Sequence, residues 1–128
     1  MKLIESLGHD EVVLALAIRV NRKYPSAHGM CALMAKDLTL VLKEYGIIAR
    51  HVVGQFRLDE PHAENYTQSD EFSGDDCLVD HDWVEVEGKI LDTSARQFRK
   101  DVTSNIPDIV FIDGTDPLYL RYDPLGYV

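Results

Sequence analysis

The chain has 128 residues, of which 45% are hydrophobic, and its formal net charge is −9 at pH 7. This length suits one domain with its own core, and the hydrophobic content is typical of a globular rather than a disordered chain. The negative charge disfavours nucleic acids and anionic membranes as partners, because both would be repelled. We therefore expect a single domain over residues 1–128.

The first residues indicate a cytoplasmic protein. Residues 1–5 reach the acidic side chain of Glu5 at once and lack the pattern of a secretory signal. The longest apolar run, residues 12–18, is too short to span a bilayer. We therefore expect a reducing compartment in which Cys31 and Cys77 are free thiols.

A first helix is predicted over residues 9–24. Asp10 can cap its start, and Pro25 follows its end. The residues of its apolar stripe recur at helical spacing and are Val13, Leu16, Ala17 and Val20. The high apolar fraction of residues 12–20 predicts that this helix is covered on more than one face.

A second helix is predicted to open at Gly29-Met30-Cys31-Ala32 and to run to about Tyr45, before Gly46. Its apolar stripe consists of Met34, Leu38, Val41, Leu42 and Tyr45. Cys31 falls in the first turn, where free N–H groups and the helix dipole favour a thiolate. Cys31 is therefore a candidate nucleophile, and the alternative is that it is a small buried hydrophobic residue.

The middle of the chain changes character twice. Residues 47–58 are rich in β-branched and aromatic side chains and predict a strand, in which Gly54 indicates a bulge or a close backbone approach. Residues 59–76 then carry seven acidic side chains and no Lys or Arg. We expect a long acidic loop there. It is either a solvated loop or a lid that selects a cationic substrate.

The remaining predicted elements are strands. Residues 77–86 and 89–93 flank Glu87-Gly88, a plausible tight turn. Two further strands are predicted over residues 109–112 and 118–122, with turns at Asp113-Gly114 and Asp123-Pro124. Two helices followed by a run of strands indicate an α+β fold, with the helices packed on an antiparallel sheet.

The expected hairpin brings a histidine and an aspartate together. His81 and Trp83 share one face of their strand because side chains alternate along it. If Glu87-Gly88 is a two-residue loop, Trp83 faces Asp92, so Asp92 lies diagonally across from His81 on that face. A three-residue loop would turn Asp92 away, so this geometry depends on the register.

These residues have complementary chemistry. A cysteine nucleophile needs a basic partner, and that partner needs an orienting acceptor, so we assign Cys31, His81 and Asp92 to these roles. The N–H of Cys31 can stabilise an oxyanion. The candidates for a second oxyanion donor or for the substrate cleft are Tyr24, His28, Gln55 and Trp83, with core packing as the alternative for Trp83.

Two segments resemble transglutaminase-like cysteine proteins. The first is Gly29-x-Cys31 with Ala35, Leu38, Leu42, Gly46-Ile47, Ala49-Arg50 and Gly54, and the second is His81-x-Trp83-Val84-Glu85-Val86 followed by Leu91-Asp92-Thr93. The resemblance implies a papain-like α+β core with Cys31 as nucleophile, His81 as base and Asp92 as orienting acid. The family includes transamidating enzymes, proteases, amidases and deglycosylating enzymes, as well as members that have lost catalysis. The acidic residues 59–76 have no counterpart in this pattern, so it implies no substrate preference.

Three functions remain as hypotheses. The first is an acyl-transfer enzyme that hydrolyses or transamidates a protein, peptide or small amide through a Cys31 thioester. The second is an inactive binding module on the same fold whose acidic surface engages a protein partner. The third is a metal site of His62, Cys77, Asp80 and His81, although a strand would place Cys77 and His81 on one face without any metal. The first hypothesis requires no metal, and the sequence has no Gly-rich phosphate loop that would indicate a nucleotide, so we expect no cofactor.

Overall fold

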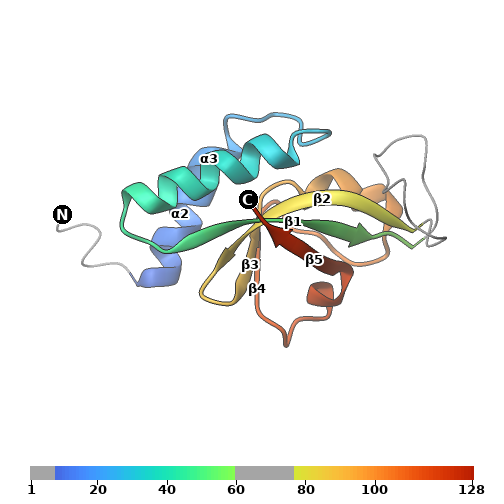
Figure 1. Ribbon diagram of the computed structural model, residues 1–128. Helices are drawn as coiled ribbons and strands as arrows, with labels where there is room; N and C mark the ends of the chain where they lie inside the picture. Colours follow the sequence, from blue (N-terminus) through green and yellow to red (C-terminus); the bar gives the residue numbers. More distant parts are fainter. Residues whose placement is uncertain (1–7, 60–76) are drawn as a thin grey trace.

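A computed structural model describes residues 8–59 and 77–128 of the chain, and it is an α+β structure. Helices α2 (His9–Asn21) and α3 (Cys31–Glu44) pack on a five-stranded antiparallel sheet (Figure 1). The strands are β1 (Ala49–Arg57), β2 (Leu78–Val86), β3 (Lys89–Asp92), β4 (Val110–Ile112) and β5 (Tyr122–Tyr127), in the spatial order β4-β3-β2-β1-β5. Most of the predicted acidic loop, residues 60–76, lies outside the described residues. No helix in the described ranges is long and apolar enough to cross a membrane.

Helix α2 buries the predicted stripe, but its ends differ from the prediction. Gly8 caps its start and donates its N–H to the Glu11 side chain at 3.3 Å. Asp10 is not the cap. It lies in the first turn, where its carboxylate contacts Lys89 Nζ at 3.1 Å. The helix ends at Asn21 rather than Tyr24, and Ile18 in its apolar segment is 42% exposed.

Helix α3 begins at Cys31, as predicted, and its apolar stripe is buried from Met34 to Leu42. Gly46 has a φ of +76°, the left-handed conformation that ends a helix at low cost in glycine. Tyr45 is the exception in the stripe, because it is half-exposed and its hydroxyl accepts a hydrogen bond from Arg19 Nη1 of α2 at 3.4 Å. Cys31 therefore sits at the first residue of a helix held by its inward face.

The β2–β3 hairpin has the register on which the site geometry depends. Val86 pairs with Lys89 and Val84 with Leu91, which leaves Glu87-Gly88 as a two-residue loop. Both loop residues have positive φ, +51° and +78°, as the tight turn that matches strand twist requires. The predicted two-residue loop is confirmed, so His81 and Asp92 lie on the same face of the sheet.

Gly54 in β1 has both properties predicted for it. The pairing of β1 with β5 shifts register between Val53 and Gly54. A Cβ at Gly54 would lie 2.3 Å from the Asp123 carbonyl oxygen and 2.5 Å from the Trp83 ring. Glycine therefore allows β5 and Trp83 to approach the middle of β1 closely.

The C-terminal part corrects two predictions. Residues 118–121 are not a strand, because Pro117–Arg121 form a 3₁₀ helix, η2, whose Leu118 N–H donates to the side chain of Asp116 at 2.9 Å. Asp123-Pro124 is not a turn but part of β5. Pro124 is tolerated there because β5 is an edge strand and because the register shift lies at this point.

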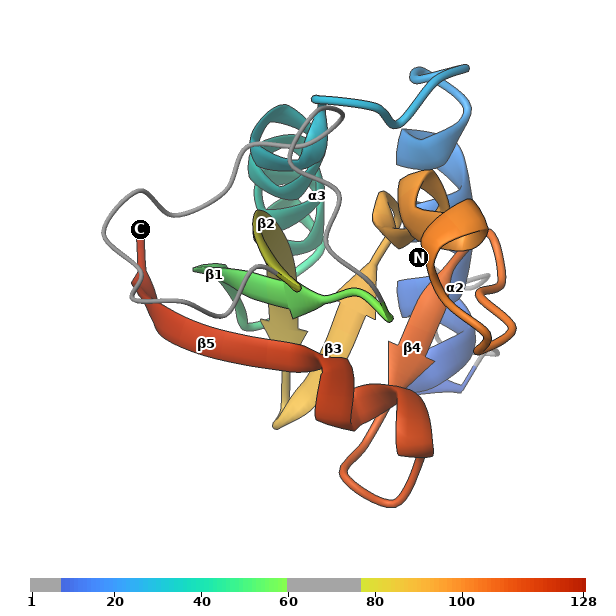
Figure 2. The same cartoon turned by 90° about the vertical axis from the view of Figure 1, so that its right-hand side faces the viewer.

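The sheet separates two cores. The face under α2 and α3 is aliphatic and includes Leu16, Leu38, Leu42, Val84 and Leu91. The opposite face is covered by the 3₁₀ helix η1 (Ala95–Asp101) and by η2. Its core includes Phe56, Trp83 and Tyr122 of the sheet and Phe98 of η1. In the view of Figure 2, α3 lies above β1 and β2, whereas β5 and η2 lie below. His81 and Asp92 belong to the aromatic face.

Candidate active site

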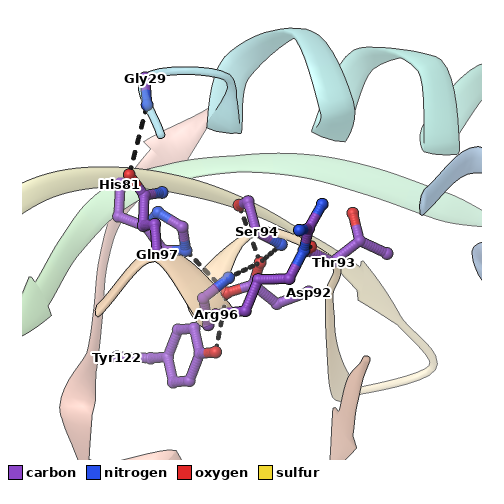
Figure 3. Close-up of polar contacts among 9 residues, drawn as sticks. Gly29, His81, Asp92, Thr93, Ser94, Arg96, Gln97 and Tyr122 are labelled. Carbon is purple, nitrogen blue, oxygen red and sulfur yellow. Dashed lines mark hydrogen bonds and ion pairs between the residues drawn. The ribbon is translucent and has the colours of Figure 1, made fainter. Parts of the chain in front are cut away.

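Asp92 is the most densely hydrogen-bonded side chain of the site. It is the last residue of β3 and is 2% exposed. Its Oδ1 accepts hydrogen bonds from Ser94 N–H at 2.8 Å, Ser94 Oγ at 3.0 Å and Ala95 N–H at 3.1 Å (Figure 3). The carboxylate thus caps the turn that leads into η1, and its orientation is fixed by the backbone next to it.

His81 meets the other oxygen of the same carboxylate. Its Nε2 lies 2.6 Å from Asp92 Oδ2, and the two side chains are 0% and 1% exposed. The predicted contact between His81 and Asp92 is therefore present. With Nε2 donating to Asp92, the second ring nitrogen, Nδ1, points elsewhere.

Tyr122 also binds this carboxylate, although no pattern in the sequence predicts the contact. Its hydroxyl donates to Asp92 Oδ2 at 2.8 Å from β5, thirty residues further along the chain. Asp92 therefore accepts five hydrogen bonds in all, two of them at Oδ2. A buried tyrosine needs a partner for its hydroxyl, but only the pairing of β5 with β1 determines which partner it finds.

The charges of this pair reinforce each other. Burial lowers the pKa of His81, but the charge and hydrogen bond of Asp92 outweigh it, and the pKa rises from 6.5 to about 10. Burial raises the pKa of Asp92, but His81 and the hydrogen bonds from Ser94 and Tyr122 outweigh it and bring that pKa below its usual value. Both shifts favour the ion pair, an imidazolium beside a carboxylate, over the neutral forms.

Cys31 acts on the same imidazole. A hydrogen bond and the charge of Cys31 are among the causes that raise the pKa of His81, after those of Asp92. Within the described residues, the buried Nδ1 of His81 has no hydrogen-bond partner at standard geometry. Cys31 itself is partly exposed and is a free thiol. A partly exposed thiol therefore interacts with the same imidazole that Asp92 binds.

Arg96 ties the connection before α3 to the segment after β3. Its guanidinium donates to the carbonyl oxygens of Tyr24 at 2.5 Å, Pro25 at 3.3 Å and Thr93 at 3.3 Å. The connection leads into Cys31, and Thr93 follows Asp92 directly. Arg96 therefore fixes the helix that carries the thiol relative to the strand that carries the carboxylate.

Gln97 makes a second link of this kind. Its side-chain oxygen accepts a hydrogen bond from the Gly29 N–H at 3.4 Å, two residues before Cys31 (Figure 3). Gly29 has a φ of +72°, which explains why glycine stands there. Neither Arg96 nor Gln97 was predicted, because their partners are backbone groups about seventy residues away.

Aromatic rings enclose the imidazole. The His81 ring meets Phe98 edge-on at 5.0 Å and Phe56 at 5.7 Å between ring centroids. Trp83 lies 6.0 Å away and is 3% exposed, so it packs in the core beside His81, the alternative considered for it. It also borders a cavity of about 50 Å³ that Tyr122 shares. These ring contacts account for the complete burial of the imidazole.

The three candidates for a second oxyanion donor lie in different places. The Tyr24 hydroxyl donates to the Asp37 carboxylate on α3, and this bond raises the pKa of Tyr24 to about 12. His28 is exposed in the connection, where its N–H donates to Ser26 Oγ at 3.4 Å. Gln55 is buried but follows Gly54, the residue paired with His81, so its side chain points to the opposite face of the sheet.

The hypothetical metal site finds little support in its residues. His62 lies outside the described residues, and Asp80 is exposed whereas His81 is buried and holds Asp92. The Cys77 thiol lies 3.9 Å from the Asp59 carbonyl oxygen. Between residues 8 and 59 and between 77 and 128, no three His, Cys, Asp or Glu side chains come together as a metal site.

No protein-family model, curated protein or solved structure matches this chain. The function proposed below therefore rests on the geometry of its own residues.

Proposed function

We propose that this chain is a cysteine-nucleophile acyl-transfer enzyme with a papain-like core, which hydrolyses or transamidates an amide bond. One observation carries the proposal: Asp92 binds Nε2 of a fully buried His81, while Nδ1 has no described partner and the Cys31 thiol acts on the same ring. A buried charge pair costs free energy, and such pairs concentrate at functional sites.

Acylation follows from these positions. The Cys31 thiolate attacks the carbonyl carbon of the amide, and the N–H of Cys31 at the start of α3 stabilises the resulting oxyanion. The His81 imidazolium donates its Nδ1 proton to the leaving nitrogen, so the C–N bond breaks and an amine departs. The acyl group remains on Cys31 as a thioester, and His81 is neutral.

Deacylation reverses the proton transfer. Neutral His81 takes a proton from water, or from an amine, as that nucleophile attacks the thioester carbon. The C–S bond then breaks, the acid or the new amide departs, and Cys31 and His81 return to thiolate and imidazolium. Water gives hydrolysis and an amine gives transamidation.

Asp92 and Tyr122 are positioning residues in this scheme. The Asp92 carboxylate fixes which ring nitrogen of His81 is held and favours the imidazolium. The Tyr122 hydroxyl and the Ser94 and Ala95 N–H groups hold that carboxylate in place. Together these groups hold the imidazole ring in one orientation, with Nε2 toward Asp92 and Nδ1 on the opposite side of the ring.

The test uses p-nitrophenyl acetate, an activated acyl donor that needs no specific substrate pocket. We expect a rapid release of nitrophenol and an acetyl group on Cys31, located by mass spectrometry of peptides. Cys31→Ser should abolish the rapid phase, and Cys77→Ser, which changes the other cysteine, should retain it. A folded chain that acetylates both cysteines slowly and equally would contradict the proposal and favour a binding module on the same fold.

A further inference from the structure

A groove with an unusual charge lies on the far side of α3 from Cys31. One cavity of about 480 Å³ opens between the C-terminal half of α3 and the residues that lead into β1. A second cavity of about 220 Å³ continues it along the first residues of β1 and shares Thr39, Leu40 and Ala49 with the first. Both elements are visible in Figure 1. Pockets of this combined size hold several side chains of a ligand.

The lining of the groove differs from the rest of the chain. Asp and Glu outnumber Lys and Arg by 22 to 13 in the sequence, yet neither Asp nor Glu lines either cavity. The groove instead combines cationic and apolar side chains, notably Lys36, Lys43, Arg50, Leu40, Ile47 and Ile48. A cationic groove on an otherwise acidic chain is electrostatically complementary to an acidic ligand.

The two lysines of the groove are available to a ligand. Lys36 and Lys43 are exposed and make no ion pair with any described residue. Arg50 differs, because it binds Glu85 at 2.6 Å and lies over the Tyr127 ring. Two turns of α3 separate the lysines, so together they mark the two ends of the groove.

Apolar side chains beside these lysines are exposed to an unusual degree. Ile48 is 82% exposed and Leu40 is 50% exposed. Exposed apolar side chains that line a cavity and are flanked by charge are typical of a binding surface. We propose that this groove binds a segment of a partner protein that combines apolar side chains with Asp or Glu.

Two other occupants fit less well. A second copy of this chain, or an anionic membrane, would have to approach a molecule of net charge −9 against long-range repulsion. A membrane surface is also too flat to fill a groove. A short acidic segment is repelled much less than a whole chain or a membrane, because it carries few charges. Those charges lie next to the two lysines, which attract them. The groove is also separate from Cys31, so this proposal does not depend on the proposed catalysis.

The test measures fluorescence anisotropy of a labelled peptide in which leucine alternates with glutamate, added to the full chain. A second peptide has lysine in place of each glutamate. We expect the glutamate peptide to bind at least about tenfold more tightly than the lysine peptide, and its binding to weaken as salt is added. The double variant Lys36→Glu/Lys43→Glu should weaken the glutamate peptide about tenfold or more and strengthen the lysine peptide.

Lys23→Glu/Lys100→Glu is the matched control, because it makes the same change in net charge at two exposed lysines outside the groove. It should change binding far less, and Ile48→Ser should weaken binding without a change in charge. Equal effects of the two double variants would overturn the proposal. The absence of peptide binding would also overturn it. The same holds if the chain self-associates and Lys36→Glu/Lys43→Glu abolishes that association, or if the chain binds phosphatidylserine vesicles more strongly than the peptide.

Discussion

The two faces of the sheet bury side chains of opposite kinds. Under α2 and α3 the core is aliphatic, and burial of apolar area is sufficient to explain why those elements pack together. On the other face, aromatic rings enclose a histidine and an aspartate that are 0% and 2% exposed. The desolvation free energy lost when two charges are buried exceeds their mutual attraction unless every polar atom has a hydrogen-bond partner. Stability explains the first face but does not by itself explain the second.

Each face also carries a His–Asp pair, which makes the comparison sharper. On the helix face, His51 Nε2 lies 2.7 Å from Asp82, and these side chains are 11% and 16% exposed. On the aromatic face, His81 lies 2.6 Å from Asp92, and both side chains are withdrawn from solvent. The residue types and distances are alike. Full burial and the four further donor groups that bind Asp92 distinguish the second pair.

Removal of Asp92 should therefore have the largest effect. Asp92→Ala leaves an imidazole and four other donors without their acceptor, and we expect a loss of about 4 kcal/mol in the free energy of unfolding. Asp82→Ala breaks the more exposed pair and should cost about 1 kcal/mol. Urea unfolding of both variants measures the difference. Equal losses would mean that burial does not distinguish the two pairs.

Truncation of a side chain in the aliphatic core should lower the free energy of unfolding without changing the His81–Asp92 site. Leu16→Ala removes a buried side chain of α2 and should cost about 3 kcal/mol. Leu16 lies on the other face from His81, so the imidazole resonances of His81 in NMR spectra should titrate as in the parent chain. A shifted titration would show that the two faces are coupled.

Loss of the Tyr122 hydroxyl should have a smaller but specific effect. Tyr122→Phe removes one hydrogen bond to a buried carboxylate and should cost about 2 kcal/mol. That hydrogen bond lowers the pKa of Asp92, so its loss makes the carboxylate more basic. The more basic carboxylate should bind the His81 imidazolium more strongly and raise the pKa of His81. Tyr119→Phe, at a partly buried tyrosine of the same cluster, is the control. An unchanged His81 titration in Tyr122→Phe would contradict the positioning role.

The last prediction concerns the pH dependence of stability. The pKa of His81 is about 10 in the folded chain and 6.5 when unperturbed, so its stabilising contribution is complete below about pH 6.5 and is lost as pH rises toward 10. Stability of the parent chain should fall across this range more steeply than that of His81→Gln, measured by urea unfolding at successive pH values. Parallel curves would mean that the imidazolium form is not stabilised by the fold.

The sequence predicted those parts of the fold that depend on neighbouring residues. Both helices follow from contiguous apolar spacing, and the hairpin register follows from Glu87-Gly88. The contact between His81 and Asp92 could be predicted because both residues lie on that one hairpin. The prediction failed at residues 117–124, where Pro117 starts a 3₁₀ helix and Pro124 lies in an edge strand, so that local apolar spacing gave the wrong element.

The rest of the site depends on contacts between distant segments. Tyr122 reaches Asp92 only because β5 returns to pair with β1, and Arg96 binds carbonyl groups about seventy residues earlier. Neither contact has a local pattern in the sequence. Side chains that bind backbone groups across the fold could therefore be found only from the structure.

The most direct measurement is the rate at which iodoacetamide alkylates each cysteine of the folded chain at neutral pH, followed by mass spectrometry of peptides. Cys31 and Cys77 are both partly exposed, so access alone does not favour either one. We predict that Cys31 reacts at least about tenfold faster than Cys77 and that Asp92→Asn, where it remains folded, reduces this advantage. Equally slow alkylation of the two cysteines would contradict the proposed pairing of Cys31 with His81.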